Sequence, residues 1–396
     1  MKLAYFVHDL NDPAVRRRVR MLRAGGAEPV VLGFHRGETA PAEVSGAPAV
    51  DLGRTYDARL GHRARATALA AMTAGRWRRL LQGSEAVMAR SLEMLAVASA
   101  ARVLAGLRGP LTYECLDIHR MMLGEGPKAR AARAAERALM RHADLLIVSS
   151  PAFLSAYFEP RQGVRRRLRL PVRLVENKTL EVEGEAPRLA PAPAPAPGPP
   201  WRIAWLGAIR CARSLDLLTD LARRRPDLVQ VSIHGRPAYT EFTDFDARVA
   251  SAPGVTFGGA YGAEDLPRLY GQAHFCWAID YMEEGQNSAW LLPNRLYEAS
   301  RFGAAPIAIA RVETGRWLAA RNLGLRIEDP RDLEAVLDGL RAQDYARLRR
   351  ELEAMPTSAF VADVAESRAF VAAIMTATGG DVAKVELDSS TAKVAI

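Results

Sequence analysis

The chain contains little cysteine and has no long apolar run. Its three cysteines lie far apart in the sequence and form neither a disulfide framework nor a metal-spaced pair. No apolar stretch approaches the roughly 20 residues of a membrane-spanning helix, and "MKLAYFVHDL" reaches charged residues too early for a signal peptide. We therefore expect a cytoplasmic protein that meets a membrane only from its surface.

Length and charge divide the chain into two parts. At 396 residues the chain exceeds what one hydrophobic core usually covers, so two domains are expected. Residues 1–182 hold 30 Lys and Arg against 17 Asp and Glu, whereas the rest hold 24 against 28. A basic first half favours an anionic partner. Arginines on solvated helix faces are an equal alternative.

Short apolar runs alternate with helical patterns along residues 1–182. This order is typical of βαβ units and predicts a doubly wound α/β domain with a parallel sheet. The Gly25-Gly26 pair ends the first predicted helix. The predicted strands are the runs at 2–10, 29–34, 86–90, 111–115 and 144–150. The later predicted helices cover 91–105 and 128–142.

A Pro/Ala-rich stretch, 183–200, interrupts this order and predicts a linker. The α/β pattern then restarts over 201–356 as a second doubly wound, Rossmann-like domain. Residues 357–378 predict a helix that packs back on the first domain, and 379–396 predict a disordered tail. Two such domains place the largest cleft between them, at the carboxyl ends of both sheets.

One segment of the second domain, "LLPNRLYEASRFGAAPIA" (291–308), has the pattern of a ligand site. Pro293 suits a first helical turn, so a helix is predicted from about that residue. Arg295 and Glu298 then share a helix face, where Glu accepts hydrogen bonds from a vicinal diol and Arg holds a phosphate. The alternative is an ordinary surface ion pair.

Small and polar residues surround two predicted helix starts in this domain. Asn287 and Ser288 precede the helix that opens with Pro293 and Asn294, where an anion would bind well. A similar start follows the strand at 201–207. There Ser214 is the predicted N-cap, and the loop that leads to it carries Gly207, Arg210 and Arg213.

The order of these features resembles the nucleotide-sugar-binding signature of GT-B glycosyltransferases. Residues 1–36 and 273–310 together resemble bacterial exopolysaccharide glycosyltransferases of the succinoglycan type, and the resemblance covers about residues 1–376. It implies two Rossmann-like domains that face each other across a cleft. It also implies transfer of a sugar from a nucleoside diphosphate to a saccharide acceptor.

The resemblance also implies roles for the residues of the second domain. Glu298 matches the Glu that binds the donor ribose, and Arg295 matches the basic residue near the diphosphate. Trp290 stands where the common E-x7-E pattern has its first Glu, so the stereochemical outcome stays open. The other implied donor-binding residues are Asn287, Ser288, Asn294, Gly207, Arg210, Arg213 and, for the base, His234. No metal or other cofactor is expected.

Ionisable residues follow two predicted strands of the first, acceptor-binding domain. Asp9 follows the first strand, and Glu114, Asp117 and His119 lie at the end of the strand at 111–115. An inverting transfer needs a base to take the acceptor hydroxyl proton. Asp117 is the first candidate, ahead of Glu114, His119 and Asp9. Capping of a turn is the alternative role for these side chains.

Two basic runs, 16–23 and 165–173, predict contact with anionic lipids at the inner face of the plasma membrane. A lipid-linked saccharide acceptor would be found there. Nucleic acid is not expected, because aromatic residues are absent from both runs. The alternatives are a nucleotide-sugar epimerase of the same architecture and a non-catalytic protein that binds anionic membranes.

Overall fold

The computed structural model describes residues 1–56, 60–182 and 193–377. The backbone divides into two units. The first holds Met1–Glu176 and the described residues from Ala362 onward, and the second holds the described part of Asn177–Val361. Most of the predicted linker, 183–192, and the predicted tail, 379–396, lie outside the described residues.

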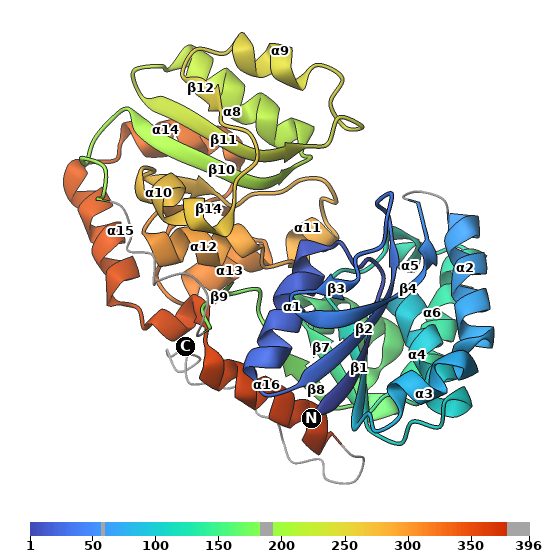
Figure 1. Cartoon of the computed structure of the whole chain (residues 1–396). Coiled ribbons are helices and arrows are strands. Elements are labelled where there is room, and N and C mark those ends of the chain that lie inside the picture. The colour runs from blue at the N-terminus through green and yellow to red at the C-terminus, as the bar shows by residue number, and fades with distance from the viewer. Residues whose placement is uncertain (57–59, 183–192, 378–396) are drawn as a thin grey trace. The chain divides into compact units, whose positions relative to one another are not determined.

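The first unit is built on an eight-stranded sheet flanked by helices (Figure 1). Its strand order is β3-β4-β2-β1-β5-β6-β7-β8, and all neighbours are parallel except β3 and β4. The strands are β1 (Lys2–Val7), β2 (Glu28–His35), β3 (Glu43–Val44), β4 (Ala47–Arg54), β5 (Ala86–Arg90), β6 (Leu111–Cys115), β7 (Leu145–Val148) and β8 (Val172–Leu174).

The helices of this unit begin where the sequence offers caps. Asp12 caps the first one by accepting a hydrogen bond from the Ala14 amide at 2.8 Å, and Pro13 occupies its first position. The α-helices are α1 (Pro13–Ala24), α2 (Leu60–Met72), α3 (Arg78–Leu81), α4 (Leu92–Leu104), α5 (Arg120–Leu123), α6 (Pro127–Met140), α7 (Pro151–Phe153) and α16 (Val364–Thr376). A 3-10 turn, η1 (Ala74–Trp77), and two π-helical segments, η2 (Leu154–Gln162) and η3 (Val164–Leu168), complete the unit.

The last described helix, α16, packs on the first, α1. Gly25 ends α1, and a Cβ at this position would collide with the backbone of Ser367. The Arg18 guanidinium lies 4.8 Å from the centre of the Phe370 ring. Residues near both ends of the chain therefore build one hydrophobic core.

The second unit is built on a six-stranded parallel sheet of order β12-β11-β10-β13-β14-β15. Its strands are β10 (Trp201–Ile209), β11 (Val229–Pro237), β12 (Val255–Phe257), β13 (Phe275–Trp277), β14 (Ala305–Ile309) and β15 (Leu325–Ile327), and the short β9 (Thr179–Leu180) pairs with β16 (Val361–Ala362). Reversal of strand order beside β10 makes the carboxyl edge of this sheet the expected place for a ligand.

Helices flank this sheet as well (Figure 1). They are α8 (Ala212–Arg224), α9 (Phe245–Ala250), α10 (Leu266–Gly271), α11 (Asn287–Trp290), α12 (Asn294–Phe302), α13 (Glu313–Ala319), α14 (Leu333–Asp338) and α15 (Ala342–Ala354), with 3-10 turns η4 (Ala263–Asp265), η5 (Pro330–Asp332) and η6 (Thr357–Ala359). None of the helices in the described ranges is long and apolar enough to cross a membrane.

Candidate functional site

The carboxyl edge of the second unit's sheet is lined by glycines. Gly207 of β10 and Gly235 of β11 are in register, and the Gly235 amide donates a hydrogen bond to the Gly259 carbonyl at 2.7 Å. All three have positive φ, which glycine adopts without strain. A Cβ at Gly207 or Gly259 would point into open space. The backbone at Gly207 and Gly259 therefore has open space beside it, and the donor-binding role of Gly207 stays a prediction.

Gly235 is required for this close approach of strands. A Cβ at this position would collide with the Gly207 carbonyl oxygen, and φ of 144° disfavours any side chain. We expect Gly235→Ala to destabilise the protein by about 2–4 kcal/mol in urea unfolding. Gly26→Ala is the matched control, because φ is also positive there but nothing lies within 4 Å. Equal losses in the two variants would contradict the role of packing.

The basic loop after β10 meets the loop after β13. Arg213 Nη1 lies 2.6 Å from Glu284 Oε2, and its guanidinium lies 4.2 Å from the centre of the Tyr281 ring. Arg210 Nη2 lies 3.5 Å from Asp280 Oδ2. Both arginines are about half exposed, so an incoming anion can reach them. The structure thus brings two segments together that lie 70 residues apart.

The start of the helix after this loop differs from the prediction. Helix α8 begins at Ala212, and Cys211 is its N-cap, with Sγ accepting a hydrogen bond from the Ser214 amide at 3.4 Å. Ser214 is fully buried within the first turn, so its prediction as the N-cap is wrong. Arg213 still projects from the first turn of a 13-residue helix, where backbone amides favour an anion.

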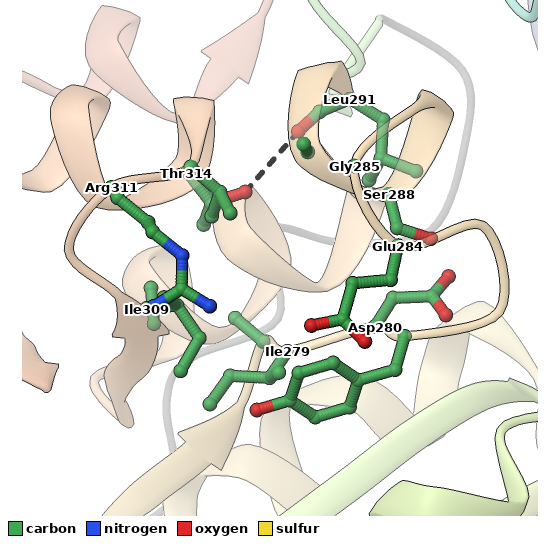
Figure 2. A pocket seen from close by; sticks show the side chains of 14 residues that line it. Ile279, Asp280, Glu284, Gly285, Ser288, Leu291, Ile309, Arg311 and Thr314 are labelled. Atoms are coloured by element: carbon green, nitrogen blue, oxygen red, sulfur yellow. Dashed lines mark hydrogen bonds between the residues drawn. The ribbon is translucent and has the colours of Figure 1, made fainter. Parts of the chain in front are cut away.

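A pocket of about 340 Å³ lies between the loops that follow β13 and β14. Figure 2 shows Arg311 on one side of this pocket and Asp280 and Glu284 on the other, with Ile279 between them. Thr314 closes one end by donating a hydrogen bond to the Leu291 carbonyl at 3.2 Å. The remaining lining residues are Ala278, Tyr281, Gly285, Ser288, Ala289, Leu291, Ala308, Ile309 and Val312.

Two predicted residues, Asn287 and Ser288, lie in a one-turn helix, α11, and not in an open loop. Ser288 lines the pocket, and its hydroxyl accepts a hydrogen bond from the Glu283 amide at 2.9 Å. Asn287 is buried and donates a hydrogen bond to the Glu283 carboxylate. Ser288 therefore lies on the wall of the pocket, whereas Asn287 is hydrogen-bonded within the turn.

Helix α12 begins at Asn294, one residue later than predicted, because Pro293 is its N-cap in an extended conformation. Asn294 is exposed at this helix start. Arg295 donates a hydrogen bond from Nη2 to the Ile279 carbonyl at 3.2 Å and so holds the end of β13. The predicted phosphate contact of Arg295 stays a prediction, and the structure adds this contact with the backbone.

Glu298 lies on the same helix among tyrosines. The Tyr270 hydroxyl donates a hydrogen bond to Glu298 Oε2 at a long 3.5 Å. Burial raises the pKa of Tyr261 and of Tyr270, and the negative charge of Glu298 adds to both shifts. Both phenols therefore stay protonated at neutral pH and can donate hydrogen bonds. This places Glu298 as an acceptor in a partly buried, polar environment.

His234 lies within β11, three residues before the strand ends at Pro237, and is half-buried against Gly258, where a Cβ would collide with the imidazole ring. Burial lowers the pKa of His234, the charge of Arg268 lowers it further, and the charge of Asp265 opposes them. The ring is therefore neutral at pH 7. A neutral, flat ring beside a bare backbone is suited to packing against a planar base.

Glu114 lies at the end of β6 inside the core of the first unit, so it is not available as the predicted proton acceptor. Its carboxylate accepts hydrogen bonds from Arg18 Nε at 2.6 Å, Arg90 Nε at 2.7 Å and the Tyr5 hydroxyl at 2.8 Å, and it is 0% exposed. Burial alone would raise the pKa of Glu114, but the charges of both arginines lower it to about 2. Glu114 is therefore structural.

Two other predicted bases, in the loops after β1 and β6, form hydrogen bonds with the backbone of their own loops. Asp9 is buried, accepts a hydrogen bond from the Asn11 amide at 3.0 Å and lies 3.7 Å from Arg36 Nε. His119 caps α5 by accepting a hydrogen bond at Nδ1 from the Met121 amide at 3.2 Å. This contact places the proton of a neutral ring on Nε2, so His119 is a donor toward solvent.

Asp117 is exposed in the loop that follows β6. Its backbone carbonyl accepts a hydrogen bond from Cys115 Sγ at 3.3 Å, which ties the turn to the strand end. The carboxylate thus lies at the carboxyl edge of the first sheet, where a parallel α/β unit presents its ligand-binding groups. Of the four predicted bases, Asp117 has the most suitable position.

The two basic runs differ in exposure. Arg18, in the middle of the first run, is buried and belongs to the Glu114 network, so this run does not form one continuous basic face. In the second run, the exposed residues are Arg165, Arg166, Arg167 and Arg169. Among the described residues no group of three or more His, Cys, Asp or Glu side chains is arranged to hold a metal ion.

Comparison with known proteins adds a close relative. The chain is 44% identical over 383 residues to the succinoglycan biosynthesis protein ExoL of Rhizobium meliloti (strain 1021), covering 96% of this chain and 94% of that protein. No protein-family model matches the chain.

Two solved structures share the fold. One is Alr3699/HepE of Anabaena in complex with UDP and glucose (TM-score 0.66, 15% identity, 96% of this chain and 100% of that chain). The other is WaaG, a glycosyltransferase involved in lipopolysaccharide biosynthesis (TM-score 0.59, 15% identity, 96% and 100%). The predicted fold of two Rossmann-like domains and the predicted resemblance are confirmed.

Proposed function

Because the chain belongs to the family of the succinoglycan biosynthesis protein ExoL, we propose that it is a GT-B glycosyltransferase of bacterial exopolysaccharide synthesis. It moves a sugar from a nucleoside-diphosphate sugar to a saccharide acceptor. The observation that carries this proposal is the pocket at the carboxyl edge of the second sheet, with Arg210 and Arg213 beside it. The complex of the Anabaena protein with UDP and glucose makes UDP-sugars the first donors to test.

In this proposal the second unit binds the donor. Arg210, Arg213 and the first turn of α8 hold the diphosphate, and the charge that develops on the leaving group is stabilised there. Glu298 accepts hydrogen bonds from the ribose hydroxyls, and His234 packs against the base. The sugar would lie in the pocket between Ser288 and Arg311.

The first unit supplies the acceptor side of the reaction. We assign Asp117 as the base that takes the proton of the attacking hydroxyl, which corresponds to an inverting transfer. The acceptor is a lipid-linked saccharide, so the protein works at the inner face of the plasma membrane. Support for this comes from the excess of basic residues in 1–182.

The direct test is thermal unfolding with a panel of nucleoside-diphosphate sugars. A donor at 100 times its Kd stabilises the folded protein by ~2.7 kcal/mol. Glu298→Ala should weaken that donor's binding about 10- to 100-fold, because a charged hydrogen-bond acceptor contributes ~1.5–3 kcal/mol. Glu353→Ala, an exposed carboxylate on α15, is the matched control.

The proposal fails if no nucleotide sugar protects the wild-type protein. If a donor protects the wild type and Glu298→Ala equally, the ribose contact is assigned to the wrong residue. Product analysis with a saccharide acceptor also separates transfer from the epimerase alternative, since an epimerase changes the donor without any acceptor.

A further inference from the structure

Large apolar side chains are exposed on the outer helices of the first unit. On α2, Leu69 is 60% and Met72 is 71% exposed, and at the end of α4, Val103 is 78% and Leu104 is 45% exposed. Leu80 of α3 is 40% exposed. Soluble monomers rarely gather such residues on one surface unless something covers them.

These side chains belong to neighbouring segments. Helix α2 packs against α4 (Figure 1). Both helices contact the turn η1 that follows α2. Leu69 and Met72 are three residues apart and so share one helix face. A Cβ at Gly75 of η1 would lie 3.6 Å from the Leu104 carbonyl oxygen. We call the five residues Leu69, Met72, Leu80, Val103 and Leu104 the apolar patch.

The charge in the segments that carry the apolar patch is mostly positive. Residues 61–83 contain five arginines and no Asp or Glu, and residues 95–108 contain two arginines and no Asp or Glu. Arg63 is paired with Glu93, and Arg102 with Asp144. The exposed arginines that remain in these segments are Arg65, Arg76, Arg78, Arg79 and Arg108.

We propose that the apolar patch and these arginines bind an anionic phospholipid bilayer, with the five apolar side chains inserted among the headgroups. This rests on the proposed function, which places the acceptor on a lipid. Apolar side chains framed by basic ones are the pattern of a surface that lies in a membrane interface. A second copy of the chain would bring the same positive charge to the patch, which disfavours a dimer here.

The surface proposed here differs from the run at 165–173. Arg165, Arg166, Arg167 and Arg169 are exposed, but no large exposed apolar side chain of the described residues belongs to that run. Such a run attracts anionic lipid by charge alone, and salt screens this attraction. The patch adds insertion of apolar groups, which salt does not screen.

Vesicle co-sedimentation of the full chain tests the proposal, with phosphatidylglycerol-rich vesicles and pure phosphatidylcholine vesicles as probes. The variant Leu69→Ser, Met72→Ser should lower binding to the anionic vesicles at least about tenfold. Arg76→Gln, Arg79→Gln should lower it by a similar factor, at about fivefold per arginine. The matched control Arg165→Gln, Arg166→Gln, Arg167→Gln should lose less than either, because these arginines are not part of the proposed surface.

Donor protection in thermal unfolding is measured on every variant, and it should be unchanged because none of these residues lies in the donor unit. The proposal is overturned if the patch variants sediment like the wild type, if the control loses more than they do, or if they change the oligomeric state by light scattering without changing lipid binding. Failure of every donor to protect the wild type would instead contradict the proposed function.

Discussion

Replacing Asp117 with asparagine is expected to lower kcat about 10²- to 10⁴-fold, the usual contribution of a general base. Asparagine keeps the size of the side chain but cannot accept the hydroxyl proton. Donor binding should be unaffected, because Asp117 belongs to the first unit and the donor residues to the second. The loss should therefore appear in kcat and not in the Kd of the donor.

Initial rates with a saccharide acceptor and the donor identified by thermal protection measure this effect. The control is Glu28→Gln, an exposed carboxylate at the start of β2 and so at the opposite, amino edge of the same sheet. The anomeric configuration of the product, read by NMR, gives an independent check on inversion. If Asp117→Asn keeps more than a third of the wild-type kcat, or if the product retains configuration, Asp117 is not the base.

The largest effect on stability is expected for Glu114→Gln. This change removes a buried charge and leaves Arg18 and Arg90 without compensation, which costs about 3–5 kcal/mol. Urea unfolding at neutral pH measures the loss. Glu93→Gln is the matched control, since its pair with Arg63 is partly exposed and should cost at most about 1 kcal/mol.

Replacing the whole network by apolar residues separates charge from packing. The triple variant Glu114→Leu, Arg18→Met, Arg90→Met should recover most of the stability lost in Glu114→Gln, because no charge is left buried. If the triple variant is no more stable than Glu114→Gln, the network contributes through its hydrogen bonds and shape and not through charge balance.

The carboxylate of Glu114 is expected to make the free energy of unfolding depend on pH. The arginines lower the pKa of Glu114 to about 2 in the folded protein, whereas an unfolded chain has a glutamate pKa of about 4.3. The stabilisation is therefore complete above about pH 5 and is lost as the pH falls toward 2. Between pH 7 and 3, the free energy of unfolding should fall less steeply in Glu114→Gln than in the wild type.

Much of the fold follows from local patterns in the sequence. The strands β5 and β6 have the predicted bounds, because continuous apolar runs between polar loops indicate buried parallel strands. Helices α2 and α15 were not predicted. The helix α15 carries a signal, since Tyr345, Leu348 and Leu352 are spaced on one face and buried, whereas α2 is rich in alanine and has only a weak amphipathic pattern.

The site shows where local patterns stop being informative. A position at a strand end makes both Asp117 and Glu114 candidates, and only the distant arginines Arg18 and Arg90 make the second one structural. The same reasoning applied to β13 and β14 would have found Asp280 and Arg311, which follow those strand ends. Local sequence patterns do not predict contacts between segments that lie far apart in the chain.

The packing of α16 on α1 has a consequence for synthesis on the ribosome. The first unit lacks this helix until the second unit has been translated, because α16 follows β16 in the chain. At typical elongation rates the interval from Glu176 to Ala362 lasts roughly 10–40 s. During that time α16 does not cover the α1 surface around Gly25, so the core of the nascent first unit is incomplete. Truncation of the chain before Val364 would leave the core incomplete.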